Sequence, residues 1–425
     1  MKTGICRKTG TYWLAMLLGL GCGVANAATL DGSQNLSSYP PIALEGGTQN
    51  VVTNGAGFYN FADRLGDGSS NAVTPSGLNL TNRYLNMNNV SYPDLRLKLN
   101  GANLTATTGY LGDRYTGDVY IYDVGAIAMG DGYLRAGEQR ALYIGQDGVA
   151  GPRAGSIQVN GFFATGAGYN SRITVYGSGD VLMRNAAGVA TNVNTTTYNG
   201  GPITILHDGT FLANKVLANG AGSVGGVLLF NGDVLGDGAS GTFTAASLDN
   251  HDTYLVFGAY NTPVGSITIS NYTAVTVGSI DTRKLSGDAF AGSVLITGIV
   301  NNVQLTGDIN LLGRYALYTG SLKIYAGGTI TVNNLNLSNV NYAAFDASGA
   351  SYITGLLTGT NGAAATNLGN IGTALRTPSG GKIYYTPSQN PGLGGQTIPL
   401  ANLAGTPGAG GVLRPKPQGT VVWFE

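Results

Sequence analysis

Cysteine and charge are both scarce in this chain of 425 residues. The two cysteines, Cys6 and Cys22, lie near the N-terminus, so we expect neither a disulfide framework nor a cysteine metal site along the rest of the chain. Charged residues make up 10% of the composition, and 22 basic residues balance 22 acidic ones. This balance excludes a strongly basic nucleic-acid-binding protein and an acidic disordered chain.

Long apolar runs and helical periodicity are scarce as well. Beyond residue 27 no stretch holds 18 uninterrupted apolar residues, so we expect no transmembrane segment there. Instead, short β-rich runs alternate with Gly, Asn, Asp and Ser, which is typical of strands joined by turns. The 69 glycines follow no three-residue period, which excludes collagen. The sequence therefore predicts an all-β protein.

The first 27 residues have the features of a secretory signal peptide. Lys2, Arg7 and Lys8 supply positive charge, residues 13–20 are apolar, and residues 25–27 form an Ala-x-Ala cleavage site. We therefore expect a secreted or cell-surface protein whose mature chain starts at Ala28.

Cys22 leaves a second processing route open. The segment Gly19-Leu20-Gly21-Cys22 resembles a lipobox, although Gly19 stands where leucine is usual. Cleavage before Cys22 would instead give a lipid-anchored protein.

Proline is unevenly distributed and suggests a division of the chain. Residues 101–370 contain three prolines, whereas residues 371–425 contain seven. Because proline cannot donate a backbone hydrogen bond to a sheet ladder, the proline-poor region is expected to form the sheet. The predicted parts are a signal peptide (1–27), an N-terminal β region or cap (28–100), a β-solenoid (101–370) and a Pro/Gly-rich C-terminal cap or tail (371–425).

A short repeat supports the solenoid. A Gly-Ser pair precedes an alternating apolar strand at spacings of 27 and 28 residues, and a second apolar pair follows at the same period. The first strands are residues 265–269, 292–296 and 320–324; the second pairs are Val275/Val277, Val303/Leu305 and Ile330/Val332.

The repeat predicts which side chains lie inside, because alternate strand residues point to opposite faces. The expected interior ladders are Ile267/Val294/Leu322, Ile269/Ile296/Ile324 and Val277/Leu305/Val332. Thr268 and Lys323 should point outward, and Leu295 is expected to be exposed or covered by a loop. Residues 101–370 would form roughly ten coils at about 4.8 Å each.

These repeats resemble secreted right-handed parallel β-helices, which occur in bacterial adhesins, autotransporter passengers and the pectin-lyase-like superfamily. The resemblance covers about residues 100–370 and implies a fold rather than a function. Two features set the sequence apart from known β-solenoids. It ends soon after the solenoid, so we expect no membrane barrel of its own, as an autotransporter would have, and it lacks the Gly-Gly-x-Gly-x-Asp repeats of calcium-binding β-rolls.

One polar cluster is a weak catalytic candidate. Asp249, His251 and Asp252 lie within four residues and could perform acid–base chemistry. Polygalacturonase-like β-helices use several aspartates with a histidine and an Arg-x-Lys pair. The other histidine here is His207, and no Arg-Ile-Lys sequence follows it. The interpretation we favour is a solvated turn, because Asp, Asn and His all suit turns.

Asp233 and Asp237 are a weak candidate for a metal site. Their spacing of four residues could place both carboxylates on one edge, as in a calcium site. Asp-Gly pairs are also common in turns, and we favour that interpretation. We expect no cofactor and no resident metal.

Two further features have both a structural and a functional interpretation. Five tyrosines could stack on sugar rings or simply occupy half-buried strand positions, and we favour the latter. They are Tyr115, Tyr120, Tyr122, Tyr133 and Tyr143. Residues 371–425 could cap the open end of the solenoid, which we favour, or serve as an attachment or export tail.

Together these features predict an exported structural or adhesin-like surface protein without catalytic activity. Its expected partners are carbohydrates or other surface components, and not nucleic acid. The alternatives are a pectin-lyase-like lyase or hydrolase acting on polysaccharides, and a non-catalytic carbohydrate-binding module.

Overall fold

The chain folds mainly into parallel strands. In the computed structural model 48% of residues are in strands and 4% in helices, and the parallel sheets stack as a β-solenoid of about eight turns. No described helix has the length and apolar character needed to span a membrane. The described residues are 29–30, 48–51, 59–60, 77–79, 83–86, 95–98, 101, 103–105, 109–111, 118–122, 124–137, 140–145, 153–165, 171–196, 200–220, 225–252, 264–284, 290–313, 319–359 and 368–417. The predicted signal peptide and Tyr115 lie outside them.

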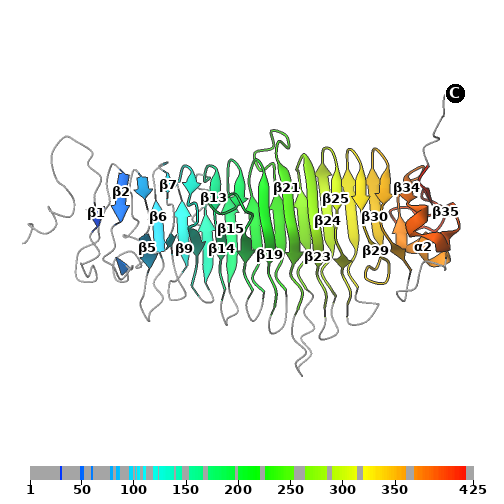
Figure 1. Cartoon of the computed structure of the whole chain (residues 1–425), viewed down its shortest axis with the longest axis horizontal. Helices are drawn as coiled ribbons and strands as arrows, with labels where there is room; N and C mark the ends of the chain where they lie inside the picture. Colours follow the sequence, from blue (N-terminus) through cyan, green and yellow to red (C-terminus); the bar gives the residue numbers. More distant parts are fainter. Residues whose placement is uncertain are drawn as a thin grey trace, which may run out of the picture. The chain divides into compact units, whose positions relative to one another are not determined.

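The fold comprises two compact units. Unit 1 contains residues 1–165 and 174–191, and unit 2 contains residues 166–173 and 192–425. Strand β15 (Arg172–Tyr176) has residues of both. Each unit is built of strands that pair in parallel with strands of the next turn (Figure 1).

Unit 1 contains short strands throughout. They are β1 (Thr29–Leu30), β2 (Thr48–Val51), β3 (Tyr59–Asn60), β4 (Gly77–Asn79), β5 (Arg83–Asn86), β6 (Leu95–Lys98), β7 (Leu104–Thr105), β8 (Gly109–Leu111), β9 (Val119–Tyr122), β10 (Ile127–Ala128), β11 (Tyr133–Arg135), β12 (Ala141–Ile144), β13 (Ile157–Val159), β14 (Gly161–Phe163) and β16 (Val181–Met183). One sheet runs β6-β9-β12, and β10 and β11 pair with β13 and β14.

Unit 2 contains the longer strands. They are β17 (Asn192–Asn194), β18 (Ile203–Leu206), β19 (Phe211–Leu217), β20 (Leu228–Asn231), β21 (Thr242–Asp249), β22 (Ile267–Ser270), β23 (Ala274–Asp281), β24 (Val294–Ile299), β25 (Val303–Leu305), β26 (Ile309–Asn310), β27 (Leu322–Ala326), β28 (Ile330–Val332), β29 (Leu335–Asn336), β30 (Ala343–Ala347), β31 (Ser351–Ile353), β32 (Leu357–Thr358), β33 (Leu375–Arg376), β34 (Lys382–Tyr385), β35 (Ile398–Pro399) and β36 (Val412–Pro415). One helix, α2 (Leu368–Ala374), and two short 3₁₀ turns, η3 (Pro387–Gln389) and η4 (Pro391–Leu393), accompany them.

Two sides of each turn in unit 2 are built from successive strands. One sheet runs β18-β20-β22-β24-β27-β30-β33. The other contains β19, β21 and β23, and the two halves of β23 pair separately with β25 and β26. A single long strand therefore bends from one side of the coil to the next.

The predicted interior ladders are confirmed. Ile267 pairs with Val294 and Val294 with Leu322, and the other two ladders pair in the same way. All nine side chains are at most 1% exposed. Leu295 is half-buried on the outward side, as are Thr268 and Lys323. The apolar ladders of adjacent turns thus form the continuous core.

The glycine that opens each repeat is required by the close approach of successive turns. A Cβ atom on Gly292 would lie 2.3 Å from the carbonyl oxygen of Gly265, and one on Gly320 would lie 2.2 Å from that of Gly292. Only glycine therefore fits this stacked position.

The structure has about eight turns, whereas the repeat length predicted roughly ten. The difference follows from unequal turns. Ile267 stacks on Leu228, which lies 39 positions earlier, but Ala343 stacks on Leu322 after only 21 positions. Insertions between strands therefore use residues that a regular 27-residue period would assign to additional coils.

Parallel pairing continues into the Pro/Gly-rich segment. Strand β34 pairs with β31 and β36 pairs with β34, both in parallel, whereas β35 joins β36 antiparallel. Helix α2 lies directly before β33 in the chain. The antiparallel strand, the helix and the two 3₁₀ turns depart from the repeating turn in this segment.

The interior ladder predicts that substitutions at two adjacent residues, Ile296 and Leu295, differ clearly in their effect on stability. Ile296→Ala should lower the free energy of unfolding by about 2–5 kcal/mol, because it leaves a cavity in the core. Ile296→Asp should be more severe, since it buries an unpaired carboxylate. Leu295→Ala is the matched control and should cost clearly less, because Leu295 is half-buried on the outward side. Thermal and denaturant unfolding would measure this, and equal midpoints for Ile296→Ala and Leu295→Ala would contradict the ladder.

Candidate functional site

The outer side of three paired strands in unit 2 carries an open groove of about 570 Å³. Strands β19, β21 and β23 bend here. The side chains at the bend are small and belong to Ala246, Ser247 and Ser279. Charged groups also line the groove: Lys215, Asp249, Asp281, Arg283 and Asp308. The groove is therefore polar and holds charges of both signs.

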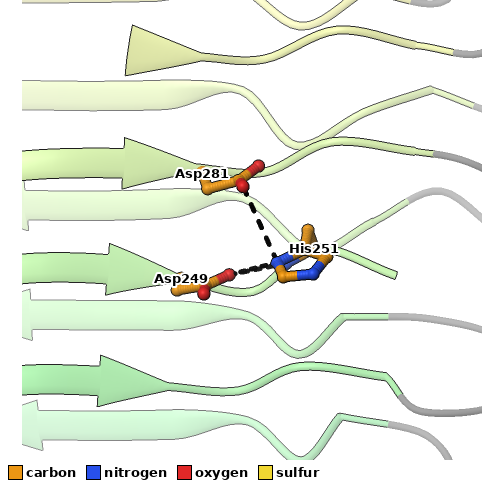
Figure 2. Close-up of side chains that lie close together, drawn as sticks. All are labelled: Asp249, His251 and Asp281. Carbon is orange, nitrogen blue, oxygen red and sulfur yellow. Dashed lines mark hydrogen bonds and ion pairs between the residues drawn. The ribbon is translucent and has the colours of Figure 1, made fainter. Parts of the chain in front are cut away.

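Two carboxylates are stacked at the ends of neighbouring strands. Asp249 ends β21 and Asp281 ends β23, and the two residues pair in register. Adjacent strands are about 4.8 Å apart, so two unneutralised carboxylates would repel each other. His251 lies between them: its Nδ1 hydrogen-bonds to Asp249 and is 3.8 Å from Oδ2 of Asp281 (Figure 2).

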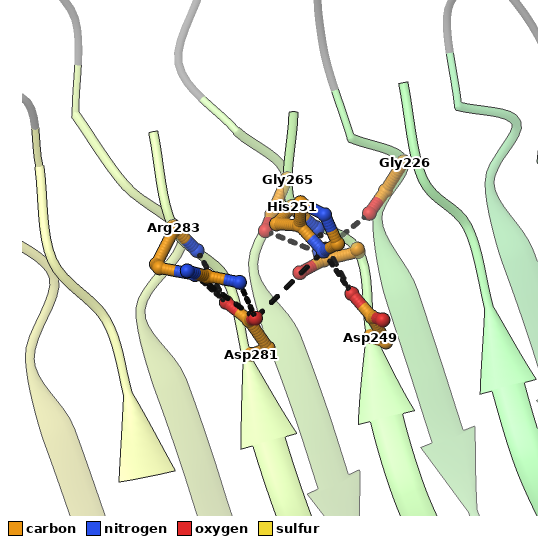
Figure 3. A network of polar contacts seen from close by, with 7 residues as sticks. Gly226, Asp249, His251, Gly265, Asp281 and Arg283 are labelled. Carbon is orange, nitrogen blue, oxygen red and sulfur yellow. Dashed lines mark hydrogen bonds and ion pairs between the residues drawn. The ribbon is translucent and has the colours of Figure 1, made fainter. Parts of the chain in front are cut away.

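Arg283 neutralises the second carboxylate. Its Nε donates to Oδ1 and Oδ2 of Asp281 at 2.9 and 3.0 Å, and its Nη2 donates to Oδ2 at 2.6 Å (Figure 3). Such a fork of charge-assisted hydrogen bonds fixes both partners in orientation. Imidazole and guanidinium thus alternate with the carboxylates along the stack.

The network changes the proton affinity of His251. The hydrogen bond to Asp249 raises the pKa of His251 above its usual 6.5, and the charges of Asp249 and Asp281 act in the same direction. Burial and the positive charge of Arg283 oppose this shift without reversing it. His251 therefore binds its proton more tightly in the folded protein than in the unfolded chain.

Asn250 fixes the adjoining backbone. Its side chain is fully buried, and Nδ2 donates to the carbonyl oxygens of Gly226 at 2.7 Å and Gly265 at 2.8 Å. One bond thus reaches across the segment 251–264 to the start of the next strand, and the other joins the neighbouring turn. Two threonines at equivalent places make related bonds, from Thr195 Oγ1 to Gly201 O and from Thr282 Oγ1 to Gly292 O, both 2.6 Å.

Asp252 lies apart from this network, inside the protein. Asp252 and Lys284 have fully buried side chains, and Lys284 Nζ is 3.0 Å from Asp252 Oδ2. A buried ion pair orders its surroundings, but removing one partner leaves a buried charge uncompensated. Asp252 therefore has a structural position rather than one in the groove.

The other histidine is also part of the core. His207 is fully buried, and its Nε2 lies 2.9 Å from the hydroxyl of Tyr272. The rings of Phe211 and Tyr272 lie against it. The expectation of a solvated turn is wrong for Asp252, because its side chain is fully buried.

The second candidate pair, Asp233 and Asp237, gains a third carboxylate from Asp208. Ligand atoms of the three lie within 4.8 Å of one another. Asp233, however, accepts hydrogen bonds from the backbone amides of Gly236, Asp237 and Gly238 at 2.8–3.3 Å. These bonds are those of an aspartate that closes a turn, which accounts for the position of Asp233 without a cation.

Asp249, His251 and Asp281 also have the spacing for a metal ion, with ligand atoms within 4.8 Å of one another. One imidazole and two carboxylates would suit zinc or manganese better than calcium, which takes six to eight oxygens. Arg283 already binds Asp281 through both carboxylate oxygens. A cation would therefore have to displace the guanidinium, so the cluster is better suited to internal ion pairing.

The sequence identified half of this cluster. It brought together Asp249 and His251, but Asp281 and Arg283 lie about thirty residues further on and were not identified. A detectable signal exists, because Ser247-Leu248-Asp249 and Ser279-Ile280-Asp281 are aligned copies. Arg283 then follows the second aspartate at the same distance as His251 follows the first.

The tyrosine cluster is partly described. Tyr120 and Tyr143 stack with ring centroids 4.9 Å apart, and Tyr133 meets Phe163 edge-on at 5.5 Å. Tyr120 and Tyr143 are half-buried on paired strands, β9 and β12. This position agrees with the strand interpretation of these residues.

Comparisons with known proteins give no further assignment. No family model, no curated protein and no solved structure matches the chain. The groove and its charges are thus interpreted from their own geometry.

The buried ion pair predicts that substitutions of Lys284 and Asp252 have strongly non-additive effects on the free energy of unfolding. Lys284→Met should destabilise the protein by about 3–5 kcal/mol, because the Asp252 carboxylate is left buried without its cation. Adding Asp252→Leu should recover most of this loss, since no charge is then buried. Denaturant unfolding of wild type, both single variants and the double variant measures the coupling. Additive losses would show that the two side chains do not act as a pair.

His251 predicts a pH-dependent stability difference. Its pKa is raised on folding, so its stabilising contribution is fully present below the unfolded pKa of about 6.5 and is lost as pH rises through the folded value. The stability of wild type relative to His251→Asn should therefore decrease from pH 6 towards alkaline pH. Thermal unfolding across this range tests it, and a difference that grows with pH would contradict the assigned network.

Proposed function

We propose that this protein is an exported structural or adhesin-like component of a bacterial cell surface. The single observation that carries the proposal is the stack of parallel turns, which repeats the same outward positions along unit 2. The N-terminal signal-peptide pattern supports export.

The outward side of unit 2 presents a regular row of polar groups. Thr244, Thr276, Gln304 and Thr331 pair in register on consecutive turns, and none of them is buried. Rows of this kind offer many equivalent weak contacts at about 4.8 Å intervals. Many weak contacts on one rigid body give avidity, which is what an adhesive surface component requires.

The internal neutralisation in the groove favours a non-catalytic role. Catalytic carboxylates need an unoccupied face toward substrate. Asp249 instead bonds to His251, and Asp281 is bound by Nε and Nη2 of Arg283. These contacts stabilise two stacked carboxylates in the fold.

One observation favours the enzyme alternative. Asp249 and Asp281 border an open groove on the outside of a β-solenoid, His251 lies close to both carboxylates, and paired carboxylates are the minimum for glycoside hydrolysis. A polysaccharide-cleaving activity would then be expected at this groove.

Export is tested by expressing the full chain in a bacterial host and analysing intact mass and protease accessibility on whole cells. We expect a mature chain of 398 residues that begins at Ala28 and is cleaved by external protease. An uncleaved chain confined to the cytoplasm would overturn the proposal. A lipid-modified N-terminal Cys22 would change the mode of attachment to a lipid anchor and retain the surface role.

The two functions are separated by incubating purified protein with acidic and neutral polysaccharides and following reducing ends and unsaturated products. We expect no turnover. Turnover that is lost in Asp249→Asn and Asp281→Asn, but not in the groove variant Ser247→Ala, would replace the structural proposal by the enzyme.

A further inference from the structure

Positive charge is concentrated in the last turns of unit 2. Residues 319–417 contain five basic residues and one acidic residue, Asp346, although the whole chain is neutral. The basic residues are Lys323, Arg376, Lys382, Arg414 and Lys416. An excess of one sign on consecutive turns creates a local field that attracts anions.

Three of these cations lie on one sheet face beside a tyrosine row. Tyr352, Tyr384 and Arg414 pair in register on β31, β34 and β36, and all three side chains are half-buried on the outward side. Lys382 precedes Tyr384 on the same face of β34, and Lys416 follows β36; both are exposed. We call these five residues the basic tyrosine face.

The aromatic rings hold the cationic groups in place. The rings of Tyr352 and Tyr384 are stacked with centroids 5.5 Å apart and planes 21° from parallel. The Arg414 guanidinium lies 4.8 Å from the centroid of Tyr384 and its Nη2 donates to the tyrosine hydroxyl, while Lys416 Nζ lies 5.7 Å from the centroid of Tyr352. Long cationic side chains held in this way lose less conformational entropy when they bind an anion.

The same combination recurs on the other sheet. Arg376 lies 3.7 Å and Lys323 5.7 Å from the ring centroid of Tyr342. Burial raises the pKa of the Tyr342 hydroxyl, but hydrogen bonds from Lys323 and Ser321 and the charge of Arg376 outweigh it and lower the pKa. A lowered tyrosine pKa is what a positive local potential produces.

We propose that the basic tyrosine face binds an acidic polysaccharide through the carboxylates of its sugar units. Ammonium, guanidinium and phenol groups offer hydrogen-bond donors and positive charge to carboxylates, and carboxylates repeat along a polyuronate chain. Lys382 and Arg414 lie on the adjacent strands β34 and β36 and Lys416 follows β36, so a polymer can engage several of these cations at once and gain avidity.

The geometry favours this ligand over single-stranded nucleic acid. Nucleic-acid bases bind by stacking on open aromatic faces. Tyr352 covers one face of Tyr384, and the Arg414 guanidinium lies over its ring from the strand on the opposite side. The Tyr384 ring is therefore enclosed on both faces, which disfavours stacking of a base on it.

The inference deepens the adhesive part of the proposed function and rests on it. It assigns a ligand class and a place on the surface, both of which can be tested with purified protein. Loss of polysaccharide binding would leave export to the cell surface untouched, and failure of export would leave binding measurable.

The test is calorimetric titration of the purified full chain with polygalacturonate, with dextran as the neutral polymer. Polygalacturonate should bind and dextran should not, and raising the salt concentration should weaken binding because screening shortens the range of the charges. Arg414→Gln alone should weaken binding about threefold, and the triple change of Lys382, Arg414 and Lys416 to Gln should weaken it more than about tenfold.

A matched stack in unit 1 supplies the control. Tyr120 and Tyr143 are stacked like Tyr352 and Tyr384, and Tyr120 hydrogen-bonds to the Asp118 carboxylate. Tyr143→Ala should leave polygalacturonate binding unchanged, whereas Tyr384→Ala should weaken it. Unfolding midpoints of all variants show that the fold is retained.

Three results would overturn the inference. These are undetectable polygalacturonate binding, equal affinity for dextran, and wild-type affinity in the folded triple variant. Tighter binding of single-stranded DNA or of anionic lipid vesicles than of polygalacturonate would likewise overturn it, because the face would then recognise polyanions of another class.

Discussion

In-register parallel pairing between successive turns is the constraint on which the rest of this structure depends. Each backbone position lies about 4.8 Å from its equivalent in the next turn, so each side chain has a fixed neighbour above and below. Apolar side chains are stabilised by this stacking, because they pack on one another in the core, as in the ladder of Ile267, Val294 and Leu322. Charged side chains are not, because like charges are then forced together.

The groove and the basic tyrosine face resolve that conflict in different ways. Asp249 and Asp281 stack directly, and His251 and Arg283 supply the opposite charge. At the basic tyrosine face Arg414 and Lys416 instead lie near the stacked rings, and no carboxylate is paired with them in the described interactions. The first arrangement satisfies its charge internally, whereas the second keeps its positive charge available to a partner.

The sequence predicted the part of the fold that repeats at a constant interval. The spacing of 27 and 28 residues between Ile267, Val294 and Leu322 was enough to assign the interior ladders. It was not enough to assign the charge cluster, because Asp249 and Asp281 are separated by an insertion that breaks the period. The burial of Asp252 was also missed, since its partner Lys284 becomes a neighbour only when turns of unequal length are stacked.

The hydrogen bonds of Thr195, Asn250 and Thr282 have a consequence for how such a protein changes over time. Each bond joins the end of one strand to the start of the next, across intervals of 6, 15 and 10 positions to Gly201, Gly265 and Gly292. The same closure therefore accommodates connections of very different length. Insertions and deletions at these points alter the outline of a turn without shifting the register of its neighbours, so the exterior can diversify while the core stays fixed.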